Sequence, residues 1–203
     1  IRRRSMVRFH VHAQKMITSF IIILALASYA FGIYAIIKKT YKPNLFSRVV
    51  WLALGVNSLF SVIQLQNNKA TLAIAWVAAF GSFLIFLGSL FSKGNRIFAR
   101  NEIIASVLLV ISLIIWLVAD VPIINLSIGL IAHFVGSLPT LIRVIHKPSE
   151  ENVLFWLFFA LASLLAFIVT PKDSLKEYMY VLYYVIFDGG MTLLSLRQYS
   201  KKA

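Results

Sequence analysis

The chain has 203 residues, of which 60% are hydrophobic, 13% are charged and none is cysteine. Soluble domains are only about 45–50% apolar, so a soluble fold of this length is excluded, and the lack of cysteine excludes disulfides, thiolate metal sites and cysteine nucleophiles. The net charge of +13 does not indicate a nucleic acid partner, because the Lys and Arg residues lie between apolar runs and at the tails, as membrane topology requires.

A membrane-spanning helix needs about 20 mostly apolar residues. Seven segments meet this need approximately and predict an all-α membrane protein with seven transmembrane helices: 16–37, 46–66, 70–92, 103–119, 121–143, 152–170 and 175–197. The first is too long for a signal peptide and lacks a small-residue cleavage site. Residues 1–15 form a basic tail, and Met6 and Met16 are both candidate starts.

The fourth and fifth segments adjoin, with Asp120-Val121-Pro122 as the only interruption. Proline disfavours helix in the residue before it, so we expect a tight turn there. The alternative is six helices, one of them very long and broken.

Charge in the connections predicts the orientation. The side that holds the first connection and the C-terminus carries twelve basic residues: Lys38, Lys39, Lys42, Arg48, Lys93, Arg96, Arg100, Arg143, Lys147, Arg197, Lys201 and Lys202. The other side carries eight: Lys69, Lys172, Lys176 and, in the tail, Arg2, Arg3, Arg4, Arg8 and Lys15. We therefore expect the N-terminus outside and the C-terminus in the cytoplasm, in the plasma membrane of a prokaryote.

Two stretches of the chain repeat one another. Trp51 follows Pro43 by the same eight residues that separate Trp156 from Pro148, and Ser58 and Ser163 each come seven residues later. Gly32 and Gly136 occupy corresponding places upstream, one residue out of register. Chance recurrence in apolar sequence is the alternative, but Trp and Pro are rare here, with 4 and 5 copies.

The repeat divides the chain into a tail at 1–15, a triple-helix bundle at 16–95, a linker helix at 96–120 and a second triple-helix bundle at 121–200. A single linking helix gives both triplets the same orientation, so the repeats are parallel. In transporters of this kind the substrate site lies between the halves near the membrane midplane.

The stretch Leu138-Pro139-Thr140-Leu141-Ile142-Arg143, followed by His146 to Asn152, resembles the PQ-loop/SWEET superfamily. Thr140 stands where PQ-loop proteins carry Gln, which is closer to the SWEET pattern, and Tyr34 stands where the first repeat would carry the matching proline. The resemblance implies a 3+1+3 helix arrangement and alternating-access transport. SWEETs move sugars, and PQ-loop members move cationic amino acids or related solutes.

Asp188 and His133 are the strongest candidates for a substrate or proton site. A carboxylate inside a membrane helix costs about 2.5–3.5 kcal/mol, so it faces a cavity or a partner. Asp188 lies between Phe187 and Gly189-Gly190, where the glycines permit close approach or loosen the helix. His133 is a proton relay, a substrate contact or a hydrogen bond between helices.

Other polar and aromatic residues complete the expected site: Asn57, Ser58, Ser163, Asn125, Trp51 and Trp156. The amides and hydroxyls would bind substrate or join helices. The tryptophans are stacking platforms or belong to the headgroup belt. Pro139, Gly136 and Gly32 are candidate hinges, the glycines alternatively close-packing contacts. The polar cluster Gln64, Gln66, Asn67 and Asn68 is a solvated loop or a vestibule.

The sequence contains no HExxH, GxSxG or GxxxxGK motif, so we expect neither an enzyme nor a metal or other cofactor. We predict a transporter of a small molecule such as a sugar or amino acid, either facilitative or linked to protons. Its expected partners are the lipid bilayer and its substrate, and an oligomer of this chain is left open. The alternatives are a seven-helix receptor or sensor, and a structural membrane subunit without transport.

Overall fold

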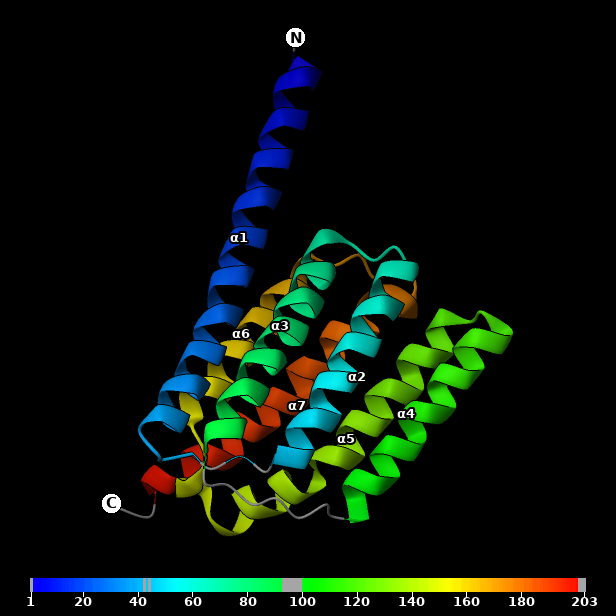
Figure 1. Ribbon diagram of the computed structural model, residues 1–203. Coiled ribbons are helices and arrows are strands. Elements are labelled where there is room, and N and C mark those ends of the chain that lie inside the picture. The colour runs from blue at the N-terminus through cyan, green and yellow to red at the C-terminus, as the bar shows by residue number, and fades with distance from the viewer. Residues whose placement is uncertain (1, 42, 44, 93–99, 201–203) are drawn as a thin grey trace.

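The described residues of the computed structural model, 2–41, 43, 45–92 and 100–200, form seven α-helices and one short 3-10 helix (Figure 1). The elements in chain order are α1 Arg2–Ile37, α2 Leu45–Gln64, α3 Lys69–Phe91, α4 Arg100–Ala119, α5 Pro122–His146, η1 Pro148–Glu150, α6 Val153–Val169 and α7 Leu175–Ser200. The all-helical prediction is confirmed for this part of the chain. Lys42, Lys93, Arg96, Lys201, Lys202 and the predicted boundary at residues 95 and 96 lie outside it.

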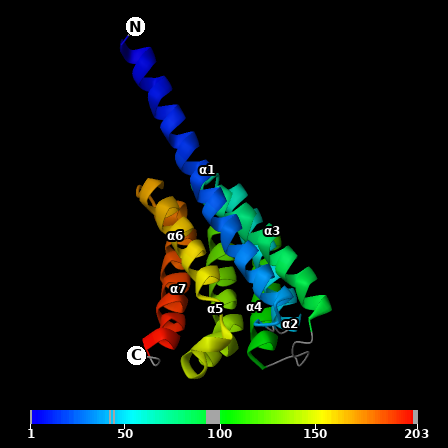
Figure 2. The same cartoon turned by 90° about the vertical axis from the view of Figure 1, so that its left-hand side faces the viewer.

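Five helices are long and apolar enough to cross a membrane: Gln14–Ile37 within α1, Leu45–Gln64, Lys69–Phe91, Pro122–His146 and Leu175–Tyr199 within α7. Helix α6 is a shorter apolar helix of 17 residues, and α4 has 20 residues. A membrane role for these two stays a prediction. Helix α1 also includes residues 2–15, and this part extends away from the other helices in both views (Figures 1 and 2).

Local sequence sets several helix ends. Helix α4 ends at Ala119 and α5 begins at Pro122, so the predicted turn is confirmed and a single broken helix is wrong. Asp120 makes this turn with a φ of 48°, a left-handed conformation that Asp tolerates better than most residues. Asn68 and Asn152 cap α3 and α6 in the same way, each side chain accepting from two backbone N–H groups of the first turn.

The helices pack in a definite order. Helix α3 contacts both α1 and α2, and α7 contacts both α5 and α6. The two sets meet through α1 with α6 and through α2 with α5, while α4 packs on α5 and also touches α2. Buried Glu102 of α4 accepts a hydrogen bond from Ser47 of α2.

Polar and apolar side chains are distributed as a bilayer would favour. Large apolar residues such as Phe60, Trp76 and Leu193 are more than half exposed on the outer surface, whereas Asn57, His133 and Asp188 are buried. A soluble monomer rarely exposes contiguous apolar surface of this extent. Lipid would cover these side chains, while the polar groups face other helices.

Candidate functional site

A small polar cavity of about 30 Å³ lies at the centre of the bundle. Its volume corresponds to about one or two water molecules. Side chains from six helices line it, and every helix except α4 contributes. The lining residues are Tyr29, Arg48, Trp51, Gly55, Ser82, Ile85, His133, Phe155, Trp156, Phe159, Tyr184 and Asp188.

Asp188 reaches this cavity from the middle of α7. Its side chain is 3% exposed, and Oδ2 has no hydrogen-bond partner. Thr192, one turn later, donates to the main-chain oxygen of Asp188 over 2.7 Å and leaves the carboxylate free of that hydroxyl. A buried, incompletely paired carboxylate is costly, so its position on a cavity wall agrees with the predicted binding role.

Gly189 and Gly190 do not serve close packing. A Cβ added at either position would have no neighbour within 4 Å, and α7 remains helical through both residues. The expectation that they let a neighbouring helix approach closely is therefore wrong in this structure, and the approach of a ligand stays a prediction.

Trp51 and Trp156 meet in the cavity, with ring centroids 6.3 Å apart and planes at 71°. Both are buried, so neither belongs to a headgroup belt. The guanidinium of Arg48 lies over the Trp51 ring at 4.3 Å from its centroid, within the range of a cation–π contact.

His133 links the two sides of this aromatic wall. Its Nδ1 lies 2.8 Å from the hydroxyl of Tyr183, and its ring centroid is 5.0 Å from Trp51 and 5.6 Å from Tyr184. The prediction of an interhelical hydrogen bond is confirmed, and the ring also lines the cavity.

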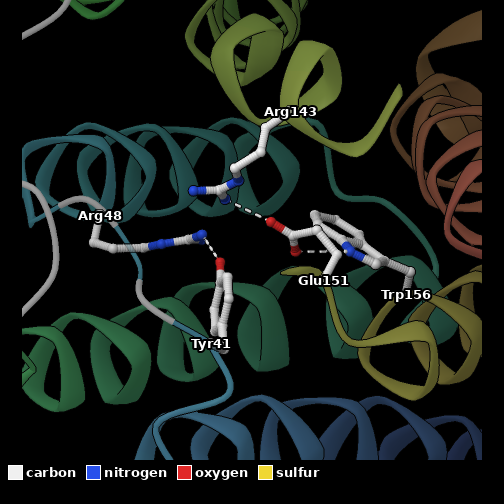
Figure 3. Close-up of polar contacts among 5 residues, drawn as sticks. All are labelled: Tyr41, Arg48, Arg143, Glu151 and Trp156. Carbon is white, nitrogen blue, oxygen red and sulfur yellow. Dashed lines mark hydrogen bonds and ion pairs between the residues drawn. The ribbon is translucent and has the colours of Figure 1, made fainter. Parts of the chain in front are cut away.

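Figure 3 shows a layer of polar and charged side chains beside Trp156, and Arg48 of this layer lines the cavity. Helices α1 and α5 end near this layer, at the end of the bundle that holds the C-terminus (Figure 1). We call Tyr41, Arg48, Arg143 and Glu151 the arginine layer. Arg48 donates to the Tyr41 hydroxyl, and Arg143 Nη2 forms an ion pair with Glu151 Oε1 at 2.5 Å. Trp156 Nε1 donates to Glu151 Oε2 over 3.4 Å.

Burial dominates the electrostatics of this layer. It raises the pKa of Tyr41 to about 12, against the opposing effect of Arg48. Burial also raises the pKa of Glu151, while the guanidinium of Arg143 acts in the opposite direction. Since an isolated buried charge is costly, the two arginines and the carboxylate depend on one another.

A second cluster joins the helices at the opposite end of the bundle. Asn68 Nδ2 donates to Thr170 Oγ1 over 2.9 Å, and the hydroxyls of Thr71 and Thr170 are 3.2 Å apart. Thr71 also lies 3.4 Å from the main-chain oxygen of Glu177. Of the predicted solvated loop or vestibule, Asn68 therefore contacts the end of α6, and Thr71, which was not in that prediction, contacts the ends of α6 and α7.

Four predicted site residues do not line the cavity: Asn57, Asn125, Ser58 and Ser163. Asn57 and Asn125 form a reciprocal amide pair at 3.2 and 3.1 Å, and Asn125 also donates to Ser61 over 2.8 Å. This pair joins α2 to α5, so the helix-joining alternative is confirmed for these amides, and a substrate role stays a prediction. Ser58 and Ser163 are buried elsewhere in α2 and α6, and Ser163 Oγ has no partner.

The candidate hinges lie at tight helix contacts. An added Cβ at Gly32 would come 2.9 Å from the Phe155 ring, and one at Gly136 would come 3.1 Å from the Cβ of Ala105. Close packing therefore explains both glycines. Pro139 lies inside α5, which continues from Pro122 to His146.

Several lining residues were not predicted from sequence: Tyr29, Ser82, Tyr184 and Arg48. Arg48 was assigned to a charged connection, but it lies within α2 and is 4% exposed. A signal was present, because Arg48 falls inside the predicted segment 46–66, one turn before Trp51. Arg143 is the last residue of the predicted segment 121–143 and Glu151 lies just before the segment 152–170, so neither stands well inside a predicted helix.

In the described part of the chain, no three His, Asp or Glu side chains are grouped so as to hold a metal ion. None of the protein-family models, curated proteins or solved structures compared with the chain matches it.

Proposed function

We propose that this protein is a multi-pass membrane transporter that moves a small solute by alternating access. The observation that carries the proposal is the cavity between α1–α3 and α5–α7, which contains the incompletely paired carboxylate of Asp188. Contacts between these two helix sets lie toward both ends of the bundle: Asn152 before α6 donates to the main-chain oxygen of Phe31 in α1 at one end, and Asn68 donates to Thr170 at the other. Rearranging one set of contacts at a time would expose the cavity to one side of the membrane.

Helix packing supports two parallel three-helix units joined by α4. The unit α1–α3 has α3 in contact with both partners, and α7 has the same place in α5–α7. If α1 corresponds to α5 and α2 corresponds to α6, the α1–α6 contact in one unit order matches the α2–α5 contact in the other. Gly32 faces Phe155 across the first, and Gly136 faces Val50 across the second, in keeping with the repeat in the sequence.

This proposal includes the likeness to the PQ-loop/SWEET superfamily and an orientation with the C-terminus in the cytoplasm. The arginine layer would then lie on the cytoplasmic side of the cavity. Two of the basic residues used to predict the orientation, Arg48 and Arg143, belong to this layer, so their positions are explained by protein contacts as well as by topology.

Uptake into proteoliposomes tests the function. Labelled sugars, amino acids and small organic cations would be offered to the native protein, with and without an inward proton gradient. We expect saturable uptake of one class and its loss in Asp188→Asn. Asp173→Asn is the matched control, because Asp173 is exposed in the α6–α7 connection and should leave uptake unchanged.

Two outcomes would count against transport. Binding of a solute without uptake would indicate a receptor or sensor. No uptake of any class by protein that is folded and correctly inserted would favour a structural subunit.

Stimulation by the proton gradient in the native protein but not in Asp188→Asn would assign proton coupling to this carboxylate.

A further inference from the structure

The cavity offers opposite charges from its two sides. Asp188 comes from α7 and Arg48 from α2, and both side chains line the cavity. Each keeps a buried polar atom without a partner, Oδ2 of the aspartate and Nε of the arginine. The two residues do not form an ion pair with each other, since the ion pairs of the described residues are Arg143–Glu151 and Lys147–Glu150.

We propose that the transported solute is a small zwitterion without net charge, held with its ammonium group at Asp188 and its carboxylate at Arg48. This inference rests on the proposed function, because it assigns the same cavity as the binding site. A ligand carrying both groups satisfies the free acceptor and the free donor together. A simple amine would leave Nε of Arg48 without an acceptor, and a simple carboxylate would leave Oδ2 of Asp188 without a donor; an unmatched buried polar group is costly.

The walls between these two groups favour the same ligand. Trp51, Trp156 and Tyr184 present aromatic rings to the cavity. Rings of this kind stabilise a nearby ammonium group and exclude water from a short aliphatic side chain.

Sugars and cationic amino acids fit less well. A sugar carries no charged group, so it would not supply the ammonium and carboxylate groups that match Asp188 and Arg48, and the amides of Asn57 and Asn125 bond to one another away from the cavity. A cationic amino acid carries two positive charges. Among the residues that line the cavity, Asp188 is the single acidic one, so it could match only one of them. A cavity of about 30 Å³ also favours the smallest zwitterions, and the rings must separate to admit them.

Alanine and its two truncated analogues test the inference directly. Ethylamine lacks the carboxylate and propionate lacks the ammonium group, while the carbon skeleton changes little. Binding would be measured in detergent with the purified full chain, with glucose and lysine for comparison. We expect alanine to bind the native protein at least about tenfold more tightly than either analogue, because each analogue leaves one of the two buried atoms, Oδ2 of Asp188 or Nε of Arg48, without a partner.

Variants of the two charged residues should shift this preference in opposite directions. In Asp188→Asn, propionate should bind about as well as alanine. In Arg48→Gln, ethylamine should bind about as well as alanine, and Arg48→Lys should restore part of the alanine preference. Asp173→Asn and Lys38→Gln change exposed residues and should leave the order unchanged.

Equal binding of alanine and ethylamine by the native protein, with no effect of Arg48→Gln, would overturn the inference in favour of amines. Tighter binding of glucose or lysine, or no binding by folded protein, would also overturn it. The measurement does not depend on transport. Alanine binding without uptake would therefore contradict the transporter but not the ligand class. Uptake of another class of solute would contradict the ligand class but not the transporter.

Discussion

The indole rings of Trp51 and Trp156 meet nearly edge to plane at the centre of the bundle, 6.3 Å apart. They come from α2 and α6, and each follows a proline, Pro43 or Pro148, by eight residues. One ring lies under the guanidinium of Arg48 and the other donates a hydrogen bond to Glu151. The tryptophan pair thus connects the cavity to the arginine layer.

Replacing Trp156 by alanine should destabilise the protein strongly. The side chain is 2% exposed, and truncation of a buried Trp costs about 3–5 kcal/mol. Thermal unfolding in detergent measures the change. Trp76 is 56% exposed on α3, so Trp76→Ala is the control and should have a much smaller effect. Similar losses for the two variants would contradict the buried position of Trp156.

The ion pair between Arg143 and Glu151 should show strong coupling. Arg143→Met leaves a buried carboxylate unpaired, whereas the double variant with Glu151→Gln removes both charges and should recover part of the lost stability. A double-mutant cycle should give a coupling of about 0.5–3 kcal/mol.

The pair Lys147–Glu150 is the matched control, because its charged groups are 3.5 Å apart and both side chains are at least half exposed. Exposed pairs of this kind contribute about 0.2–1 kcal/mol. Equal coupling in the two cycles would show that the Arg143–Glu151 pair is not sheltered from solvent.

Weakening the arginine layer should open the cavity toward the C-terminal end. The chain contains no cysteine, so a single Ser82→Cys substitution introduces one thiol in the cavity wall. We expect slow modification by a charged, membrane-impermeant thiol reagent. Addition of Arg143→Met should accelerate modification from that side of a sealed vesicle. Unchanged access would mean that the layer does not close the path.

Asn57→Ala should cost stability without changing ligand preference. Hydrogen bonds between membrane helices average about 0.6 kcal/mol and reach about 1.7 kcal/mol. The loss should appear as a lower unfolding temperature, while alanine binding stays close to native because this amide lies outside the cavity. A selective loss of binding in a stable variant would return Asn57 to the substrate site.

Two glycines, Gly81 of α3 and Gly189 of α7, should respond oppositely to replacement by alanine. A Cβ at Gly81 would lie 2.2 Å from the Tyr29 ring, so Gly81→Ala must displace a ring that lines the cavity. Gly189→Ala meets open space and should stabilise α7, by about 0.5–1 kcal/mol from helix propensity. Unfolding temperatures of the two variants test the contrast, which fails if Gly81→Ala is the more stable.

Much of the helical framework was predictable because its causes are local. Apolar length indicated the helices, and Pro122 after Asp120 indicated the turn that separates α4 from α5. The matched spacing of Trp51 and Trp156 pointed to two residues that prove to be in contact. Asp188 was recognisable because a carboxylate inside an apolar helix needs a cavity or a partner.

The partners of polar side chains were decided by tertiary structure. Asn57 and Asn125 looked like substrate ligands, but the packing of α2 on α5 pairs them with each other. Arg48 looked like part of a charged connection until the fold buried it beside Tyr41 and the Trp51 ring. The sequence by itself determined the number and apolar character of the helices, since hydrophobicity and proline act along the chain. Only the tertiary structure decided which charges face the cavity, because the burial and the partners of a polar side chain depend on which helix packs against it.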